Sequence, residues 1–284
     1  MRFTKMNGAG NDFILVENLH GELTQQQLSK LARTLCDRRM SIGADGLMAI
    51  VPAKANADFG MLFFNCDGTR GEMCGNGARC ICRYGYETGL AGETQTIETT
   101  AGLVTGTRID AKNYRIRLPD PVNLQYLALD VDGKKVGCMY LELGNPGIPH
   151  AVVQYPGLRE ADEQALFEFG RKLRYHPAFP KGANVNFLEK TGENRFYERT
   201  WERGVEDFTY ACGTGTGASV YALAEKRRCG DHAEVEVKGG LLIVDIVRVG
   251  KKCTDLLLTG PASLVCEGEV FEEAIPQEAA FGCV

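Results

Sequence analysis

Short stretches of this chain are either apolar throughout or alternate between hydrophobic and polar residues, and both patterns are typical of β-strands. The first of them are Phe3–Met6, Phe13–Val16 and Phe59–Phe64. Further strands are expected at 99–107, 114–118, 136–143, 151–155, 184–188, 195–202, 233–237, 241–247 and 255–259. Because the strands are short and few helices interrupt them, the pattern favours the α+β class.

Four stretches follow helical spacing instead. The first begins after Thr24, with Gln27 at the capping-box position. Two central helices are expected at 78–86 and 218–226, and the early part of the second is apolar all round, which is typical of a fully buried helix. Two helices have one apolar face, formed by Leu28, Leu31, Ala32, Leu35 and Cys36 in the first and by Ala165, Leu166, Phe169 and Leu173 in the other.

The chain contains two similar segments, Met73–Ala78 and Ala211–Thr216, and in each a cysteine precedes glycines and a predicted helix. The strand pattern also recurs after Pro119-Asp120-Pro121, which is the best candidate linker. One buried helix in each half therefore predicts two similar domains. The tail after Glu272 has no clear pattern and is expected to fray.

Composition excludes several classes of protein. The 284 residues carry a net charge of -5 and no basic block, so we expect neither a nucleic-acid partner nor a membrane surface. The N-terminus is polar at once, unlike a signal peptide, and no apolar run has the length of a membrane span. Eleven cysteines scattered over a long chain indicate a cytoplasmic protein with mostly reduced, buried thiols.

Cys74 and Cys212, the cysteines of the two similar segments, are candidate reactive groups. At a helix N-terminus a thiol meets free backbone N–H groups and the positive end of the helix dipole, which lowers its pKa by roughly one unit. The alternative is that both are structural cysteines, but the paired glycines favour accessible thiols. Two such thiols suit a proton transfer at opposite faces of one carbon, with coupled titrations.

Two other readings of these segments are weaker. Cys66, Cys74, Cys80 and Cys82 lie close in sequence, but the absence of a CxxC pair argues against a metal site. Gly213–Ala218 formally matches the dinucleotide pattern GxGxxG/A, yet no run of βαβ units surrounds it. The simpler use of these amides is to hold a small anion such as a carboxylate.

A set of polar residues accompanies the cysteines. Asn11, Asn65, Asn145 and Asn184 lie in turns or at strand ends, where asparagine is common for local reasons. Glu202-Arg203 precedes Cys212; it is either a surface ion pair or a carboxylate-binding group, since arginine pairs with carboxylates in two-point fashion. His150 is equally compatible with a core histidine and with a group that tunes a thiol.

The chain resembles the diaminopimelate epimerases, cofactor-independent epimerases that use two cysteines. The resemblance covers nearly the whole length, and the two cysteine segments with Glu-Arg-Gly between them are its most specific part. The motifs that carry it are Lys5–Phe13, Ile42–Gly46, Phe64–Gly68, Glu72–Cys80, Glu202–Gly204 and Ala211–Gly215.

The resemblance implies a fold of two pseudo-symmetric domains, each a mostly antiparallel sheet wrapped around a central helix. They are expected at 1–119 with about 262–277, and at 120–261, followed by a tail at 278–284. Cys74 and Cys212 match the catalytic pair. The substrate-binding positions matched are Asn11, Asn65, Gly75, Asn76, Asn145, Asn184, Glu202, Arg203, Gly213 and Thr214.

By the same resemblance we expect a homodimer without cofactor or metal that acts on a small amino-acid substrate. The expected reaction interconverts LL- and meso-diaminopimelate in lysine and cell-wall synthesis, with a thiolate as base and a thiol as acid. Glu202 and His150 are expected to tune the thiols. The alternatives are a related racemase of histidine or a lanthionine-like diamino diacid, a thiol redox or metal-binding protein, and a nucleotide-binding module.

Overall fold

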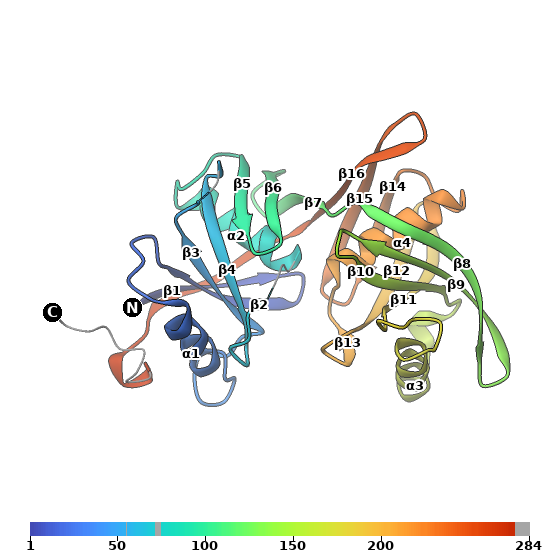
Figure 1. Ribbon diagram of the computed structural model, residues 1–284, viewed down its shortest axis with the longest axis horizontal. Helices are drawn as coiled ribbons and strands as arrows, with labels where there is room; N and C mark the ends of the chain where they lie inside the picture. Colours follow the sequence, from blue (N-terminus) through green and yellow to red (C-terminus); the bar gives the residue numbers. More distant parts are fainter. Residues whose placement is uncertain (55, 72–74, 276–284) are drawn as a thin grey trace. The chain divides into compact units, whose positions relative to one another are not determined.

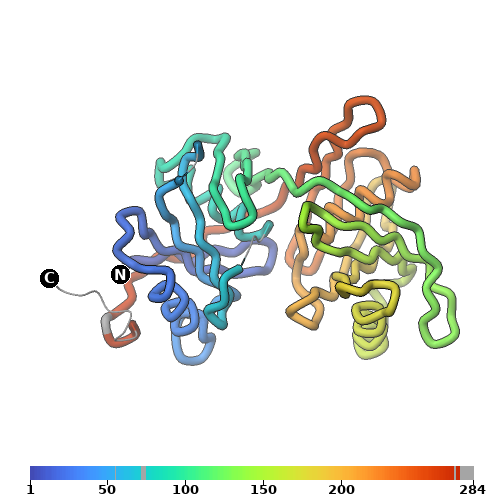
Figure 2. Tube along the Cα trace, in the orientation of Figure 1, coloured from blue at the N-terminus to red at the C-terminus, as the bar shows by residue number. Residues whose placement is uncertain are grey.

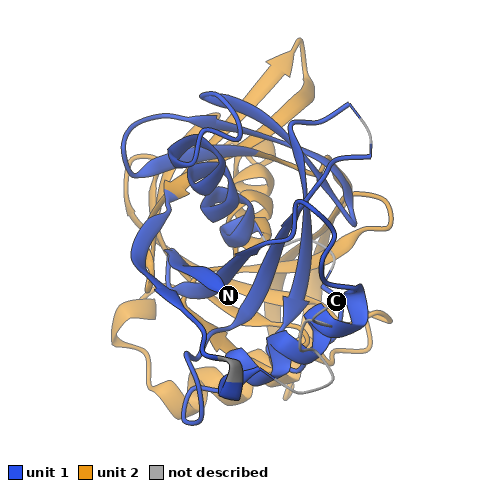
Figure 3. Ribbon diagram, turned by 90° about the vertical axis from the view of Figure 1, so that its left-hand side faces the viewer, with its two compact units in different colours: residues 1–116, 261–284 blue, residues 117–260 orange. Residues whose placement is uncertain are grey.

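The computed structural model describes residues 1–54, 56–71 and 75–275. The chain divides into two compact units, which are coloured separately in Figure 3. Unit 1 comprises Met1–Ile116 and Pro261–Val284, and unit 2 comprises Arg117–Gly260. The trace in Figure 2 shows that unit 1 is built from both ends of the chain, whereas unit 2 is one continuous segment.

Unit 1 contains one sheet with helices on both faces. The strands pair in the order β17-β1-β2-β3-β4-β5-β6-β7, and only β2–β3 and β4–β5 are parallel pairs. The elements are β1 (Arg2–Gly8), β2 (Asn11–Glu17), α1 (Gln25–Leu35), β3 (Gly46–Val51), β4 (Phe59–Asn65), α2 (Gly75–Glu87), β5 (Thr94–Thr99), β6 (Gly102–Arg108), β7 (Asn113–Leu118), β17 (Ser263–Glu269) and the 3-10 turn η2 (Glu272–Ala274).

Unit 2 repeats this arrangement. Its strands pair in the order β8-β9-β10-β11-β12-β14-β15-β16, with β13 added beside β12, and its parallel pairs are β10–β11 and β12–β14. The elements are β8 (Pro121–Val131), β9 (Lys134–Leu143), β10 (Ile148–Gln154), η1 (Leu158–Glu160), α3 (Glu163–Arg174), β11 (Asn184–Gly192), β12 (Arg195–Glu202), β13 (Asp207–Thr209), α4 (Gly213–Glu225), β14 (His232–Val237), β15 (Gly240–Val249) and β16 (Lys252–Pro261).

The two sheets therefore match strand for strand, from β17 and β8 at one edge to β7 and β16 at the other. The helices match too, because α1 and α3 each join the two strands of the first parallel pair, and α2 and α4 each precede the second strand of the other. The central helices α2 and α4 are both 13 residues long and largely buried. Figure 1 shows that the sheet of each unit curves around its central helix. The α+β class with a mostly antiparallel sheet around a central helix is confirmed.

The outer helices close a second core on the other face of each sheet. In unit 1, Leu28 and Leu35 of α1 pack with Ile14 of β2 and Leu47 of β3. In unit 2 the equivalent cluster joins α3 to strands β10, β11 and β12; its members include Leu166, Leu173, Val153, Phe187 and Trp201. Each sheet is thus buried on both faces in its middle, which leaves little room for polar side chains without partners.

The capping box is confirmed: the Gln27 N–H donates to Thr24 Oγ1 over 3.3 Å, and the Thr24 N–H donates to Gln27 Oε1 over 2.8 Å. Ala165 was expected on the buried face of α3 but is exposed. The strand expected at 99–107 is two strands, because the chain turns after Thr99 and Gly102 starts β6.

Both central helices begin earlier than expected, at Gly75 and Gly213, so the glycines form the first helical turn. Strands β3 and β8 were not expected from the sequence. The last part of the predicted tail, from residue 276 onward, lies outside the described residues. Within the described part of the chain, no helix is both long and apolar enough to cross a membrane.

Candidate active site

Cys212 is the N-cap residue of α4, at the end of the loop that follows β13. Its side chain is nearly buried, with 7% of its surface exposed, and Sγ lies 3.6 Å from Thr214 Oγ1. The Thr216 N–H donates to the Cys212 carbonyl over 2.9 Å and closes the first turn. The thiol is therefore at a helix N-terminus as expected, but it is less accessible than the glycines suggested.

The electrostatic surroundings of Cys212 differ from the expectation. Burial raises the pKa of the Cys212 thiol well above its usual value, and the nearby Glu202 carboxylate raises it further. Hydrogen bonds from Thr214 and the Gly215 N–H act in the opposite direction, but they are the smaller effects. The predicted lowering by the helix dipole is thus wrong for Cys212, because the loss of hydration outweighs it. In the free protein Cys212 carries its proton.

Gly215 is required by close packing around the thiol. A Cβ at this position would collide with Asn186 Oδ1 and would lie 3.2 Å from Cys212 Sγ. Asn186 comes from β11, so a side chain at residue 215 would separate the helix N-terminus from the sheet. The second glycine of the Cys-Gly-Thr-Gly segment thus brings α4 onto a polar part of the sheet.

This polar part, here called the polar layer, consists of side chains on the face of the unit 2 sheet that α4 covers. Alternate residues of a strand point to the same face, and the layer therefore takes every second residue from neighbouring strands. It consists of His150 from β10, Asn184 and Asn186 from β11, and Glu198, Thr200 and Glu202 from β12, with Thr216 and Ser219 of α4 opposite.

Asn186 lies at the centre of the polar layer. Its Oδ1 accepts a hydrogen bond from Thr200 Oγ1 over 3.0 Å, and its Nδ2 lies 3.4 Å from both His150 Nδ1 and the Ala151 carbonyl. His150 is fully buried, and its Nε2 has no hydrogen-bond partner among the described residues. Burial, together with the positive charge of Arg203, lowers the pKa of His150 to about 3, so its imidazole is neutral.

Asn184 joins three segments of unit 2. Its Nδ2 donates to the Pro149 carbonyl over 3.2 Å, and its Oδ1 accepts from the Arg203 backbone N–H over 2.8 Å. The Arg203 guanidinium donates to the Lys181 carbonyl over 3.2 Å. Asn184 thereby fixes the turn that carries Glu202 and Arg203, and these three predicted residues do lie together.

Glu198 is the most buried acidic group of the polar layer. Its carboxyl receives a hydrogen bond from Thr216 Oγ1 and another from Ser219 Oγ over 2.7 Å. Burial raises the pKa of Glu198 to about 7, although the two hydroxyl donors lower it in part. A carboxyl group that titrates near neutral pH thus lies directly under the first turns of α4.

In unit 1, Cys74 lies outside the described residues, and Gly75, which follows it, is the first residue of α2. Asn76, the next residue, donates from Nδ2 to Asn11 Oδ1 over 2.5 Å and accepts from the buried Arg79 guanidinium over 2.7 Å. Asn11 and Asn76 were both predicted as site residues, and the structure brings them together. Arg79 was not predicted, and it orients Asn76.

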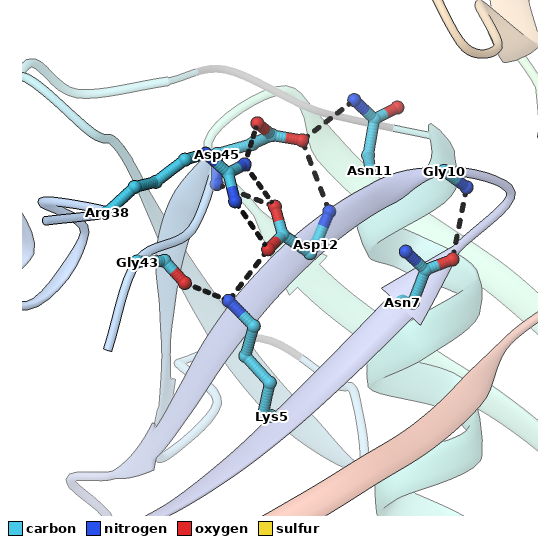
Figure 4. Close-up of polar contacts among 8 residues, drawn as sticks. All are labelled: Lys5, Asn7, Gly10, Asn11, Asp12, Arg38, Gly43 and Asp45. Atoms are coloured by element: carbon cyan, nitrogen blue, oxygen red, sulfur yellow. Dashed lines mark hydrogen bonds and ion pairs between the residues drawn. The ribbon is translucent and has the colours of Figure 1, made fainter.

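Asn11 is also hydrogen-bonded to a network of charged residues, which is shown in Figure 4. Its Nδ2 donates to Asp45 Oδ2 over 3.1 Å, and Arg38 bridges Asp45 and Asp12 through contacts of 2.7 and 2.6 Å. Lys5 lies 2.8 Å from Asp12 and donates to the Gly43 carbonyl. Burial alone would raise the pKa of Asp12, but the hydrogen bonds from Arg38 and Lys5 prevail and lower it to about 2.

Two predicted residues stand apart from these contacts. Asn65 ends β4 and donates from Nδ2 to Thr69 Oγ1 over 2.9 Å, within its own turn. Asn145 is exposed in the turn between β9 and β10. Nothing in their described surroundings distinguishes either residue from an ordinary turn asparagine.

Sequence reasoning missed Asn186, Glu198 and Thr200, although a signal was present. The spacing of two in Asn184 and Asn186, and again in Glu198, Thr200 and Glu202, puts these polar residues on one face of β11 and β12, opposite the face that carries Val185, Phe187 and Trp201. Such a face is either exposed or lined with functional groups. Among the described residues, no group of three or more His, Cys, Asp or Glu side chains is arranged to hold a metal ion.

Comparison with known proteins identifies relatives over almost the full length. A profile described as diaminopimelate epimerase matches residues 3–118 and 143–265. The diaminopimelate epimerase of Methanothrix thermoacetophila is 36% identical over 289 residues, covering 97% of this chain and 98% of the relative. That of Aquifex aeolicus is 34% identical over 286 residues, covering 97% and 99%.

Among solved structures, a probable proline racemase from Agrobacterium radiobacter K84 superposes with a TM-score of 0.69, covering 98% of this chain and 95% of that one. At 18% identity this likeness concerns the fold alone. It agrees with the matched sheets of the two units. Together with the profile match and the curated relatives, the Cys-Gly segments and the topology identify this chain as a member of the diaminopimelate epimerase family.

Proposed function

We propose that this protein is an isomerase that interconverts LL- and meso-diaminopimelate by moving a proton at one α-carbon. The observation that carries the proposal is the full-length match to diaminopimelate epimerases, combined with a thiol at the N-terminus of the largely buried helix α4, beside the polar layer. In this proposal Cys74 and Cys212 are the two groups that exchange protons with the substrate.

The chemistry requires one thiolate and one thiol. The thiolate takes the α-proton and becomes a thiol, while the second thiol gives its proton to the opposite face and becomes a thiolate. Cys212 carries its proton in the free protein, so it suits the role of acid in the first turnover, and Cys74 then acts as base. The backbone amides of Gly75, Asn76, Gly213 and Thr214 stabilise the negative charge on the carboxylate.

The polar residues near the helix ends are proposed to bind the substrate. Asn11 and Asn76 act from unit 1, and Asn184, Glu202 and Arg203 act from unit 2, with Asn65 and Asn145 completing the set. Glu202 raises the pKa of Cys212 and thus favours its thiol form. His150 is neutral, so it is proposed to act on the thiols through a ring nitrogen and not through a positive charge.

The decisive experiment is incubation with LL-diaminopimelate in deuterated water. Two products are expected, meso-diaminopimelate and α-deuterated diaminopimelate, both detected by mass spectrometry and chiral chromatography. Histidine and a lanthionine-like diamino diacid serve as control substrates for the related racemase activities. Deuteration of a control substrate alone would replace the proposed substrate, and deuteration of none would refute the proposal.

We further propose a homodimer that works in the cytoplasm without a cofactor. The family resemblance supports the dimer, and the described cysteines, none of which is joined in a disulfide, support a reducing compartment. Light scattering coupled to gel filtration tests the dimer, and a mass equal to that of one chain would refute it. Activity after exhaustive dialysis against a chelator tests the absence of a metal.

A further inference from the structure

Glu198 is a buried acidic residue that has no role in the mechanism proposed above. Its side chain lies between β12 and α4, with 1% of its surface exposed, and it forms no ion pair with another of the described residues. Burying an acidic group is costly unless hydrogen bonds compensate. Its two donors, Thr216 and Ser219, both belong to the helix whose N-cap is Cys212.

The Thr216 hydroxyl connects Glu198 to Cys212. Oγ1 of Thr216 is hydrogen-bonded to Glu198 Oε2, and the same atom lies 3.1 Å from the Cys212 carbonyl oxygen. A hydroxyl has a single proton to donate, so it cannot serve the carboxylate and the carbonyl at once. Which acceptor receives the proton depends on whether Glu198 is ionised.

When Glu198 is ionised, both of its oxygens accept, and the Thr216 proton points to the carboxylate. When Glu198 is protonated, its own O–H donates to Thr216 Oγ1, and the Thr216 proton turns to the Cys212 carbonyl. The first turn of α4 is then held by two bonds to that carbonyl, from the Thr216 N–H and from the Thr216 hydroxyl. The protonation of Glu198 thus changes how the cysteine segment is fastened.

We propose that Glu198 is a positioning residue for Cys212 and acts on it through the hydroxyl of Thr216. This inference deepens the proposed function and relies on it for the role of Cys212 in the reaction. Ser219 provides an internal contrast, because it binds the same carboxyl without contacting Cys212.

The other titratable groups around Glu198 limit the interpretation of any pH dependence. On the same face, β12 contributes Glu202 and β10 contributes His150, while α4 contributes Cys212 itself. The neighbouring strands β11 and β14 contribute Asn186 and Val235, which do not titrate. Because the pKa of His150 is lowered to about 3, its imidazole stays neutral near neutral pH. The groups whose titrations must be separated by mutation are therefore Glu198, Glu202 and Cys212.

The test uses four variants of the full chain. Thr216→Val removes the bridging hydroxyl and keeps the shape, Thr216→Ser retains the hydroxyl, Ser219→Ala removes the other donor, and Glu198→Gln removes the charge. For Thr216→Val we expect kcat to fall about tenfold with KM nearly unchanged, because small displacements of a reacting group are costly. Thr216→Ser and Ser219→Ala are expected to stay within about twofold of the parent.

A second readout does not depend on epimerisation. The rate at which iodoacetamide alkylates Cys212, followed by peptide mass spectrometry from neutral to strongly alkaline pH, reports the thiolate fraction. An ionised Glu198 raises the pKa of Cys212, so in Glu198→Gln the alkylation midpoint should move to lower pH. Thermal melts identify any variant that does not fold; if Thr216→Val fails, Glu198→Gln still decides.

The two readouts separate the two proposals. If Cys212→Ala retains activity while Glu198→Gln shifts the alkylation midpoint, the proposed reaction fails and the link from Glu198 to Cys212 stands. If Glu198→Gln leaves the alkylation profile unchanged, and Thr216→Val has the same kcat as Ser219→Ala, the positioning role of Glu198 is overturned.

Discussion

The two units share one strand order but stabilise the N-terminal ends of their central helices differently. In unit 1, Asn11 and Asn76 are oriented by formal charges, through Asp45 and Arg38 on one side and Arg79 on the other. In unit 2, the corresponding end of α4 rests on hydroxyls, amides and a single carboxyl, all buried. The comparison teaches that topology fixes where a site lies, whereas the electrostatics around it are set residue by residue.

The difference extends to the response to protons. The pKa of Asp12 is lowered to about 2, so its negative charge is stabilised in the folded state. The pKa of Glu198 is raised to about 7, so its neutral form is stabilised. The two acidic groups should therefore affect the pH dependence of stability in opposite directions.

The largest effect is expected when the thiol that is proposed to lie at the N-terminus of each central helix is removed, because this is the reacting group that the two units share. Cys212→Ala and Cys74→Ala should each lower kcat by at least about 10³-fold, since each deletes one proton donor or acceptor. Rates of conversion of LL-diaminopimelate, with circular dichroism to verify folding, measure this. If either variant retains more than about a tenth of the parental rate, the two-thiol mechanism is wrong.

A smaller loss is expected when the charged network of unit 1 is opened. Asp12→Asn removes the negative charge that Arg38 and Lys5 share and should cost about 2 kcal/mol of unfolding free energy at neutral pH. The contribution of Asp12 is complete above a pH of about 4 and disappears as the pH falls to about 2. Chemical denaturation should therefore give a gap between parent and variant that narrows in acid, and a constant gap would contradict the assigned pKa.

Glu198→Gln is expected to show the opposite sign. The folded state retains the Glu198 proton up to a pH of about 7, whereas the unfolded chain releases it near its usual value of 4.5. Stability from this group is complete below 4.5 and is lost as the pH rises to about 7. Relative to the Gln variant, the parent should lose about 3 kcal/mol of unfolding free energy over this interval.

The pH dependence of stability also contains a contribution from His150, which decreases as the pH falls over part of the same interval. Parent and Glu198→Gln share this contribution, so it cancels when the two are compared. The measurement is the difference in unfolding free energy between the two proteins at several pH values. If the parent instead loses stability relative to Glu198→Gln as the pH falls from about 7 to 4.5, Glu198 is ionised in the folded protein throughout this interval.

The smallest expected effect concerns the outer helices, where the units are alike. Thr24 caps α1 and Asp162 caps α3, and each side chain accepts from a backbone N–H of the first turn. Thr24→Ala and Asp162→Ala should each cost about 1 kcal/mol or less. Thermal melts at neutral pH measure this, and a loss well above that figure in one unit alone would mean that the two caps are not equivalent.

Much of the fold was predictable because the signals are local. The capping box at Thr24 and the bounds of β12 followed from residue type and spacing. By contrast, β8 escaped prediction because much of it is exposed and the alternation of its apolar residues shifts by one position at Leu127, and β3 is an apolar run that fits a buried helix as well as a strand. Each central helix begins at a glycine, a residue that lowers helix propensity, so the predicted starts came too late.

The candidate site was predictable where the motif itself contains the residues, as with Asn11, Asn76 and Cys212. The partners of these residues were not, because they depend on how neighbouring elements align. Glu198 meets Thr216 only because β12 and α4 are packed at one particular offset, and Asn186 meets Thr200 only in the observed pairing of β11 with β12. A raised thiol pKa likewise depends on burial, which no spacing within the segment encodes.

The position of β17 has a consequence for synthesis of the chain. β1 is translated before unit 2, yet one of its two neighbours in the sheet is β17, which is translated only after all of unit 2. Until then β1 has an unpaired edge of the kind that promotes aggregation. Unit 2 is contiguous and can complete its sheet first, so the unit whose synthesis begins later is the one that can finish folding earlier.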